Sequence, residues 1–344
     1  MRPLTFVVGT GRAGSTALTR ILHAHPDVLS LNELLAAVHG RAFPPGPVTG
    51  PEFWRILAEP QHVFDTAIRS GTAMPELLYH RRPGRFSAER EGIPALCLMP
   101  LPTLVESGAE TDALFDELAA VVPSWPSRPV AGQWRALFDW LCARFGRRVV
   151  VERSGFSLGH LPGLRATFPE ARYVHLFRDG PDCALSMSRH PGYRTILLMH
   201  RISELTGVPV NEIRPEHRAG LPPELTALLE PRFDPRLVLD SDLPLTGFGA
   251  LWSELVTDGQ AELEKVTPAA RTALRYETLL ADPVGELTRL AEFAGFEPSP
   301  AWLAAGAARL DPARQGAARR QLDDAAYAAL AGACEPGTAA LAGR

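Results

Sequence analysis

Apolar and polar positions near the N-terminus follow the order strand, turn, helix, strand. Residues 4–8 (LTFVV) are a continuous apolar run typical of a buried strand, and residues 9–16 (GTGRAGST) are a glycine-rich turn. Apolar positions at helical spacing follow in residues 17–25, and a second apolar run occupies residues 28–31 (VLSL). This order predicts an α/β protein built on a parallel sheet.

The same alternation returns in the second half of the chain. A helical apolar stripe over residues 134–145 precedes a strand-like run at residues 147–152. Further strands are expected at 171–177 and 272–277, and further helices at 161–168, 249–266, 283–296 and in the tail over 300–344. The stretches at about 40–130 and 195–245 are proline-rich and irregular, which indicates helical cap insertions into a single domain spanning residues 1–344.

Composition and charge exclude several classes of function. Lysine and arginine number 35 and aspartate and glutamate 39, so the formal net charge of −4 gives no positive excess for binding nucleic acid. The abundance of alanine, arginine, glycine and proline indicates a GC-rich, bacterial genome. No apolar run approaches the ~18 residues of a membrane span, and the N-terminal apolar run is too short for a signal segment. We therefore expect a cytoplasmic protein.

The four cysteines, Cys97, Cys142, Cys183 and Cys334, lie far apart and form no CxxC pair. They indicate neither a zinc site nor a disulfide framework, and we interpret them as reduced core thiols. The sequence predicts no metal site and gives no indication of the oligomeric state.

The glycine-rich turn fits two phosphate-binding patterns. Gly9, Gly11 and Gly14 fit GxGxxG, the dinucleotide-binding fingerprint, in which Glu33 after the second strand would hold a ribose. Gly9 and Gly14 also fit the P-loop frame GxxxxG, with Ser15 where an ATPase has its lysine. Both patterns place an anion on backbone N–H groups at the start of a helix.

The absent lysine excludes ATPase or GTPase chemistry, in which that side chain binds the β- and γ-phosphates. The loop offers instead one cation, Arg12, and two hydroxyls, Ser15 and Thr16. A positive group with hydroxyls at a helix start suits a phosphate that carries a second charged group and needs no metal. A phosphosulfate has this chemistry.

Three blocks of the chain resemble those of the sulfotransferases that use 3′-phosphoadenosine 5′-phosphosulfate (PAPS). Residues 11–16 (GRAGST) correspond to their 5′-phosphosulfate loop, commonly PRSGTT or PKSGTT. Residues 174–187 (VHLFRDGPDCALSM) correspond to their 3′-phosphate motif, an arginine at a strand end with a serine eight residues later. Residues 274–296 correspond to a third block, a strand ending in RYE and a helix ending in F-G. The blocks keep the family's order over residues 5–296.

The resemblance implies a P-loop-like three-layer α/β sandwich, with PAPS as co-substrate and no metal. It places the 3′-phosphate on Arg178 and Ser186. It places the 5′-phosphosulfate on the side chain of Arg12 and on the backbone of the five residues after it, which are Ala13, Gly14, Ser15, Thr16 and Ala17. The chemistry agrees, because a guanidinium fork binds phosphate bidentately and α/β sheets bind ligands at the carboxyl ends of their strands.

Sulfuryl transfer should resemble phosphoryl transfer, with a loose in-line transition state stabilised by positive charge. Arg12 would act on the leaving phosphate, Arg153 on the sulfuryl oxygens, and Glu33 as the general base. The cytosolic branch of the family has a histidine base where this chain has Gly155. The tyrosylprotein sulfotransferases and several bacterial members instead have a glutamate after an HP-V segment, as in HPDVLSLNE here. The alternative base is His160.

The acceptor is expected to be a small molecule with a hydroxyl group on an apolar or aromatic skeleton, because the predicted caps carry Trp54, Phe64, Tyr79 and Trp125. Two other functions stay open. One is an NAD(P)-dependent oxidoreductase of the Rossmann type, which gives the block around Arg178 no role. The other is a non-catalytic protein that binds PAPS or a related nucleotide.

Overall fold

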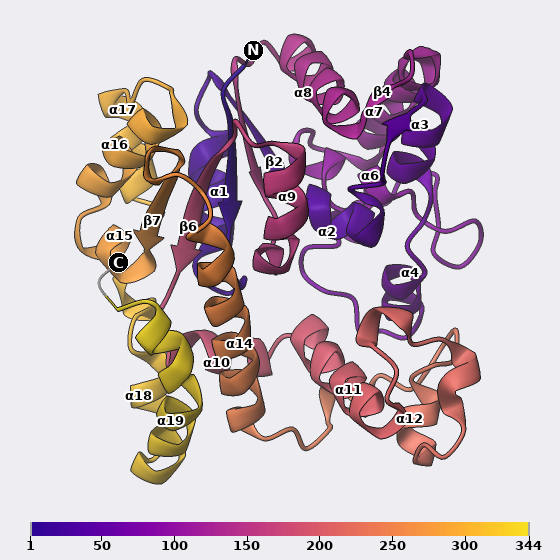
Figure 1. The fold of residues 1–344 in the computed structure, drawn as a ribbon, viewed down its shortest axis with the longest axis vertical. Helices are drawn as coiled ribbons and strands as arrows, with labels where there is room; N and C mark the ends of the chain where they lie inside the picture. Colours follow the sequence, from indigo (N-terminus) through magenta and orange to yellow (C-terminus); the bar gives the residue numbers. More distant parts are fainter. Residues whose placement is uncertain (1, 343–344) are drawn as a thin grey trace.

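Five parallel strands form the central sheet in the computed structural model, which describes residues 2–342 (Figure 1). Their order across the sheet is β2 (Val28–Asn32), β5 (Val149–Arg153), β1 (Leu4–Val8), β6 (Arg172–Phe177) and β7 (Arg271–Arg275). In the middle, Phe6 of β1 is in register with Glu152 of β5 and with Tyr173 of β6. The predicted strands are confirmed, except that the last one ends at Arg275, where helix α15 (Tyr276–Ala281) begins.

The strand order separates β1 from β2. In a Rossmann sheet the second strand lies beside the first, whereas here β5 lies between them and pairs with both. Glu33 follows β2 and is therefore one strand further from β1 than the ribose-binding carboxylate of a Rossmann fold. This sheet order argues against the oxidoreductase alternative.

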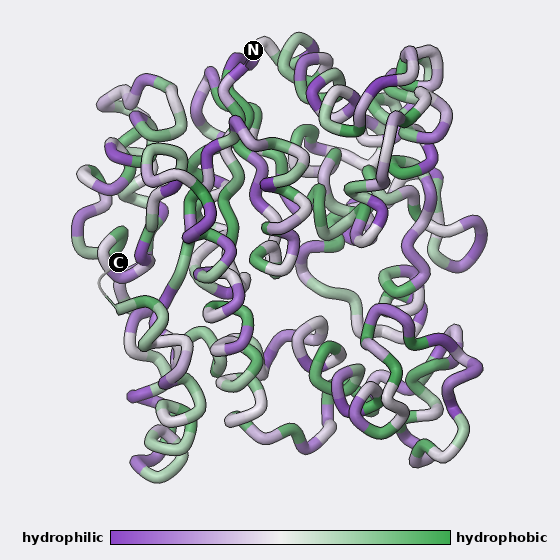
Figure 2. The backbone as a smooth tube through the Cα atoms, viewed as in Figure 1, coloured by the Kyte–Doolittle hydropathy of each residue, from purple (hydrophilic) through white to green (hydrophobic). Residues whose placement is uncertain are grey.

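Helices cover both faces of the sheet, because successive side chains of a strand point to opposite faces. Val7 and Val174 pack on one face, and Phe6 and Tyr173 pack on the other. The first face is covered by α1 (Ser15–His23), α16 (Pro283–Ala294) and α17 (Pro300–Ala307), and the second by α8 (Val130–Phe145) and α9 (Leu161–Thr167). The central strands are drawn largely in hydrophobic green in Figure 2. The three layers confirm the predicted fold class.

A further helical cluster continues from β6. Phe248, Trp252 and Leu330 are buried in it, and its helices are α10 (Gly180–Ser188), α14 (Leu245–Leu263) and α19 (Asp324–Ala340). Because β6 ends at Phe177 and α10 begins at Gly180, the predicted 3′-phosphate motif spans a strand end and the helix that follows it.

The two proline-rich stretches consist mainly of short helices. The first cap (residues 40–130) contains α3 (Gly50–Ala58), α4 (His62–Arg69), α5 (Leu78–Arg81), α6 (Ala95–Leu98), α7 (Gly108–Val121) and a hairpin of β3 (Pro47–Val48) with β4 (Arg128–Pro129). The second cap (residues 195–245) contains most of α11 (Pro191–Thr206), then α12 (Pro223–Ala227) and α13 (Arg236–Leu239). The caps touch, since Arg69 donates to the Pro231 carbonyl at 3.1 Å and Phe233 N–H donates to Ser70 Oγ at 3.0 Å (Figure 1).

All four cysteines are buried. Within residues 2–342, no group of three or more metal-binding side chains is clustered, and no helix has the length and apolar character to cross a membrane.

Candidate functional site

The glycine-rich loop joins β1 to α1 in a left-handed backbone conformation. Gly11, Arg12 and Gly14 have φ angles of 75°, 59° and 83°, a region that glycine adopts without strain. The N–H groups of residues 11–16 donate no hydrogen bond to any part of the chain from residue 2 to residue 342. The N–H of Ala17, which belongs to the predicted set, instead donates to the Gly14 carbonyl at 3.1 Å. Residues 11–16 thus form a cradle of free donors at a helix start, which suits an anion.

Two tyrosines from distant segments hold the loop in place. The Tyr193 hydroxyl donates to the Thr10 carbonyl. A Cβ on Gly11 would lie 2.1 Å from the oxygen of that hydroxyl. A Cβ on Gly14 would lie 2.2 Å from Cε2 of Tyr276. The loop therefore needs glycine at both positions, for packing as well as for backbone conformation.

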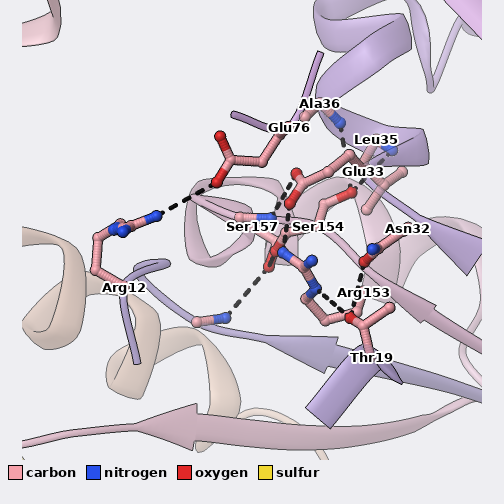
Figure 3. Close-up of polar contacts among 12 residues, drawn as sticks. Arg12, Thr19, Asn32, Glu33, Leu35, Ala36, Glu76, Arg153, Ser154 and Ser157 are labelled. Atoms are coloured by element: carbon pink, nitrogen blue, oxygen red, sulfur yellow. Dashed lines mark hydrogen bonds and ion pairs between the residues drawn. The ribbon is translucent and has the colours of Figure 1, made fainter. Parts of the chain in front are cut away.

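The Arg12 side chain extends to Glu76 of the first cap (Figure 3) and also reaches α10. Its Nε donates to Ser186 Oγ at 3.3 Å, and its Nη1 donates to Glu76 Oε1 at the same distance. The sequence places Ser186 with Arg178 at one phosphate. In the structure Ser186 instead contacts Arg12, the residue predicted to bind the 5′-phosphosulfate.

Arg178 lies at the end of β6 and is only 8% exposed. Its Nη2 donates to Asp182 Oδ2 at 2.9 Å and to the Arg314 carbonyl, and its guanidinium carbon lies 5.4 Å from the centre of the Tyr276 ring. Asp182 also accepts from Gly316 N–H at 2.7 Å. The Arg178 Nε atom is buried and has no acceptor among residues 2–342. An unsatisfied buried donor is costly, so an acceptor on a ligand at this place would stabilise the guanidinium.

Cys183 of α10 contacts the loop. Its thiol donates to the Gly11 carbonyl at 3.3 Å. Burial raises the pKa of the Cys183 thiol to about 11, while the charges of Arg178 and Arg12 act to lower it. Arg178 lies two residues before α10, and Arg12 donates to Ser186 in its last turn, so the two guanidinium groups lie at opposite ends of this helix.

Glu33 and Arg153 form a buried ion pair (Figure 3). Arg153 is the last residue of β5, and Glu33 directly follows the adjacent strand β2. Arg153 Nη1 donates to Glu33 Oε1, and Gly155 N–H donates to Oε2 at 2.8 Å. Arg153 Nε also donates to Thr19 Oγ1 of α1 at 3.2 Å. The sequence predicts both residues as catalytic but not their pairing. A small cavity is lined by Arg153 and Ser154 together with the loop residues Gly11, Ala13 and Ser15.

A second buried carboxyl supports this region. Ser154 Oγ donates to Glu152 Oε1 at 2.6 Å and accepts from Leu35 N–H at 3.0 Å. Burial raises the pKa of Glu152 to about 7; the Ser154 hydrogen bond opposes the shift, and the charge of Glu33 adds to it. Through Ser154 this carboxyl holds the start of α2 (Leu34–Val38), the helix that begins immediately after Glu33.

Glu76 and His190 belong to the site but are absent from the predicted set. His190 Nε2 lies 3.0 Å from Glu76 Oε2, and its Nδ1 accepts from Gly192 N–H at the start of α11. Burial raises the pKa of Glu76, but the hydrogen bond with His190 and the charges of His190 and Arg12 outweigh it and lower the pKa to about 2. Neither residue lies in a recognisable motif. His190 directly follows α10, and only the packing of the first cap brings Glu76 to it.

His160, the alternative base, faces His39 with a distance of 6.5 Å between ring centroids. Burial and the charge of His39 lower the pKa of His160 to about 4. The aromatic residues expected to form an acceptor surface pack inside the first cap. Tyr79 is 1% exposed, and the Trp54 ring lies 4.9 Å from that of Phe115.

Comparison with known proteins returns solved structures only, since neither a protein-family model nor a curated protein matches the chain. The chain is similar to a sulfotransferase domain from the curacin biosynthetic pathway, at 15% identity and TM-score 0.47 over 94% of this chain and 83% of that one. It is similar to a sulfotransferase domain of the olefin synthase of Synechococcus PCC 7002, at 15% identity and TM-score 0.47 over 96% and 93%. A sulfotransferase from Mycobacterium tuberculosis H37Rv matches at 18% identity and TM-score 0.43 over 96% and 77%. At such identities the function has to be argued from the site itself.

Proposed function

We propose that this protein is a sulfotransferase that takes PAPS as its donor and transfers the sulfuryl group to a hydroxyl of a small acceptor. The observation that carries the proposal is a pair of positively charged places at the two ends of α10, each suited to an anion. One is the cradle of free N–H groups with Arg12, and the other is Arg178 with its unsatisfied buried Nε. A nucleotide with anionic groups at both its 5′ and 3′ positions complements both places, whereas an adenosine 5′-phosphate complements one.

The cradle and Arg12 would bind the 5′-phosphosulfate, helped by the hydroxyls of Ser15 and Thr16. Arg178 would bind the 3′-phosphate. Charge-assisted hydrogen bonds to phosphate are strong, and burial strengthens them further. Ser186 would add its hydroxyl to the 3′-phosphate, and its hydrogen bond with Arg12 would link the two phosphate-binding places.

In the transfer step the acceptor oxygen forms a bond to sulfur while the bond from sulfur to the bridging phosphate oxygen breaks. The electron pair of the broken bond leaves with the phosphate, where the positive charge of Arg12 stabilises it. Arg153 would stabilise the sulfuryl oxygens. The proton of the acceptor hydroxyl would pass to Glu33, whose carboxylate oxygens each keep a lone pair beyond the bonds from Arg153 and Gly155.

We expect the acceptor to be apolar or aromatic. The support for this class is Phe156, which directly follows Gly155 and lies 6.1 Å from the Tyr193 ring, between centroids. Since Gly155 N–H binds Glu33, the next residue, Phe156, puts an apolar ring in the chain beside that carboxylate. A small hydroxyl compound with an apolar or aromatic skeleton would bury that skeleton here while its oxygen reaches the carboxylate.

The proposal is tested by thermal unfolding of the full chain with 3′,5′-diphosphoadenosine, 5′-AMP, NAD⁺, NADP⁺ and ATP, each with and without Mg²⁺. A ligand that binds the native state raises Tm. The expected result is a rise with 3′,5′-diphosphoadenosine that needs no metal and exceeds the rise with 5′-AMP. Equal rises with both ligands, or a strict need for Mg²⁺, would contradict it. Binding without transfer of sulfate from PAPS to any of a set of phenols and alcohols would favour the non-catalytic alternative.

A further inference from the structure

Glu76 of the first cap forms an ion pair with Arg12, the loop arginine that the proposal assigns to the sulfate donor. Glu76 Oε1 accepts from Arg12 Nη1 at 3.3 Å, and 23% of the Glu76 side chain is exposed (Figure 3). A carboxylate beside a guanidinium assigned to an anionic group competes with that group, since it satisfies the same charge. No step of the proposed transfer uses Glu76.

Glu76 belongs to a short segment of the first cap, residues 72–77, that contacts both the loop and the start of α11. Its Met74 packs so closely on the start of α11 that a Cβ on Gly192 would lie 2.4 Å from the sulfur. Within the segment, Thr72 N–H donates to the Ala67 carbonyl at 2.8 Å and Leu77 N–H donates to the Met74 carbonyl at 3.1 Å. Just before it, Ser70 binds the second cap. The conformation of this segment is thus linked to both caps.

The arrival of an anion at the loop changes the electrostatics of Glu76 in two ways. The anion partly neutralises the positive charge of the Arg12 guanidinium, so the attraction between Arg12 and Glu76 falls. The anion also carries charge of the same sign as Glu76, and like charges a few ångströms apart repel strongly where water is partly excluded. Both effects drive the carboxylate away from Arg12, while His190 holds it from the other side.

We propose that Glu76 is displaced from Arg12 when the 5′-phosphosulfate binds, so that donor occupancy releases residues 72–77 and alters the contact between the caps. This inference rests on the proposed function. It makes Glu76 a competitor for the donor and a positioning residue for the cap, with no part in proton transfer.

The test compares two ligands on the full chain and on Glu76→Gln by titration calorimetry. The ligand 3′,5′-diphosphoadenosine carries a 5′-phosphate for the loop, whereas adenosine 3′-phosphate lacks one and has no need to displace Glu76. The expected result is that Glu76→Gln binds the first ligand about two- to fivefold more tightly, the range for removal of a partly exposed ion pair, and binds the second unchanged. The matched control is Glu59→Gln on the same cap, whose 2.8 Å ion pair with Arg41 is remote from the loop residues. It should change neither affinity.

Amide hydrogen exchange of the unaltered chain gives a second measurement that needs no variant. Addition of 3′,5′-diphosphoadenosine should speed exchange at Thr72 and Leu77, and adenosine 3′-phosphate should not. Weaker binding by Glu76→Gln, or slower exchange at those amides, would overturn the inference. A loss of kcat without a change in donor affinity would also overturn it, by making Glu76 an acid-base residue. If neither ligand binds the unaltered chain, the proposed function fails instead.

Discussion

Glu33 and Arg153 stand 120 residues apart in the chain and face each other as a buried ion pair at the carboxyl ends of β2 and β5. Their side chains are 8% and 6% exposed. Removing one member of such a pair leaves an uncompensated charge in a region poor in water, which typically costs several kcal/mol. The pair is thus both a structural element and the place where the proposed base and a proposed sulfuryl-binding cation meet.

Glu33→Gln should bind 3′,5′-diphosphoadenosine as before and lower kcat by the ~10²- to 10⁴-fold typical of losing an acid-base group. The measurement is PAPS turnover alongside the fraction of folded protein, because the substitution also leaves Arg153 without its counter-charge. His160→Asn is the matched control and should retain turnover, since its ring faces His39. Retained activity in Glu33→Gln with lost activity in His160→Asn would reverse the assignment.

Arg178→Ala should weaken binding of 3′,5′-diphosphoadenosine by about 1.5–3 kcal/mol, the range for hydrogen bonds to a charged group. Binding of 5′-AMP should hardly change, because that ligand has no 3′-phosphate. The nearby Arg275→Ala serves as control, since Arg275 is 53% exposed at the end of β7 and pairs with Glu277. Equal losses in both variants would mean that general positive charge attracts the nucleotide, without a direct contact from Arg178.

Gly14→Ala should abolish donor binding and lower the free energy of unfolding by about 1–3 kcal/mol. Its Cβ would meet the buried Tyr276 ring at 2.2 Å in a residue with φ 83°. Gly46→Ala has a similar φ of 78° but open space around its Cβ, so it carries the backbone strain without the collision. Denaturant unfolding and calorimetry of both variants separate the two effects. Normal donor binding by Gly14→Ala would remove the cradle from the proposed site.

Glu152 should make stability fall as the pH rises. Burial raises the pKa of this carboxyl from 4.5 to about 7 in the folded protein, so the folded state binds the proton more tightly than the unfolded state. Its contribution is complete below about pH 4.5 and is lost as the pH rises through about 7. Glu152→Gln cannot titrate, so its free energy of unfolding should rise relative to the unaltered chain between pH 5 and pH 8. A difference that stays constant with pH would mean that Glu152 is already ionised when folded.

Local sequence patterns determine the secondary structure of this protein and the position of its glycine-rich turn. The apolar run at residues 4–8, the glycines after it and the helical spacing beyond are sufficient to predict β1, the anion cradle and α1, because backbone conformation at such a turn depends on neighbouring residues. The block around Arg178 likewise predicts a strand end followed by a helix. In each case the residues involved are close in the chain.

Only the tertiary structure decided which of these pieces meet. An apolar run shows that a strand exists but not which strands pair with it, so the position of β5 between β1 and β2 is absent from any local pattern. That position creates the Glu33–Arg153 pair. Glu76 comes from the irregular, proline-rich first cap and reaches Arg12 only because that cap packs against the loop, where it also meets His190 just after α10. Contacts between residues so distant depend on the packing of the whole chain, which the spacing of residues along the sequence does not record.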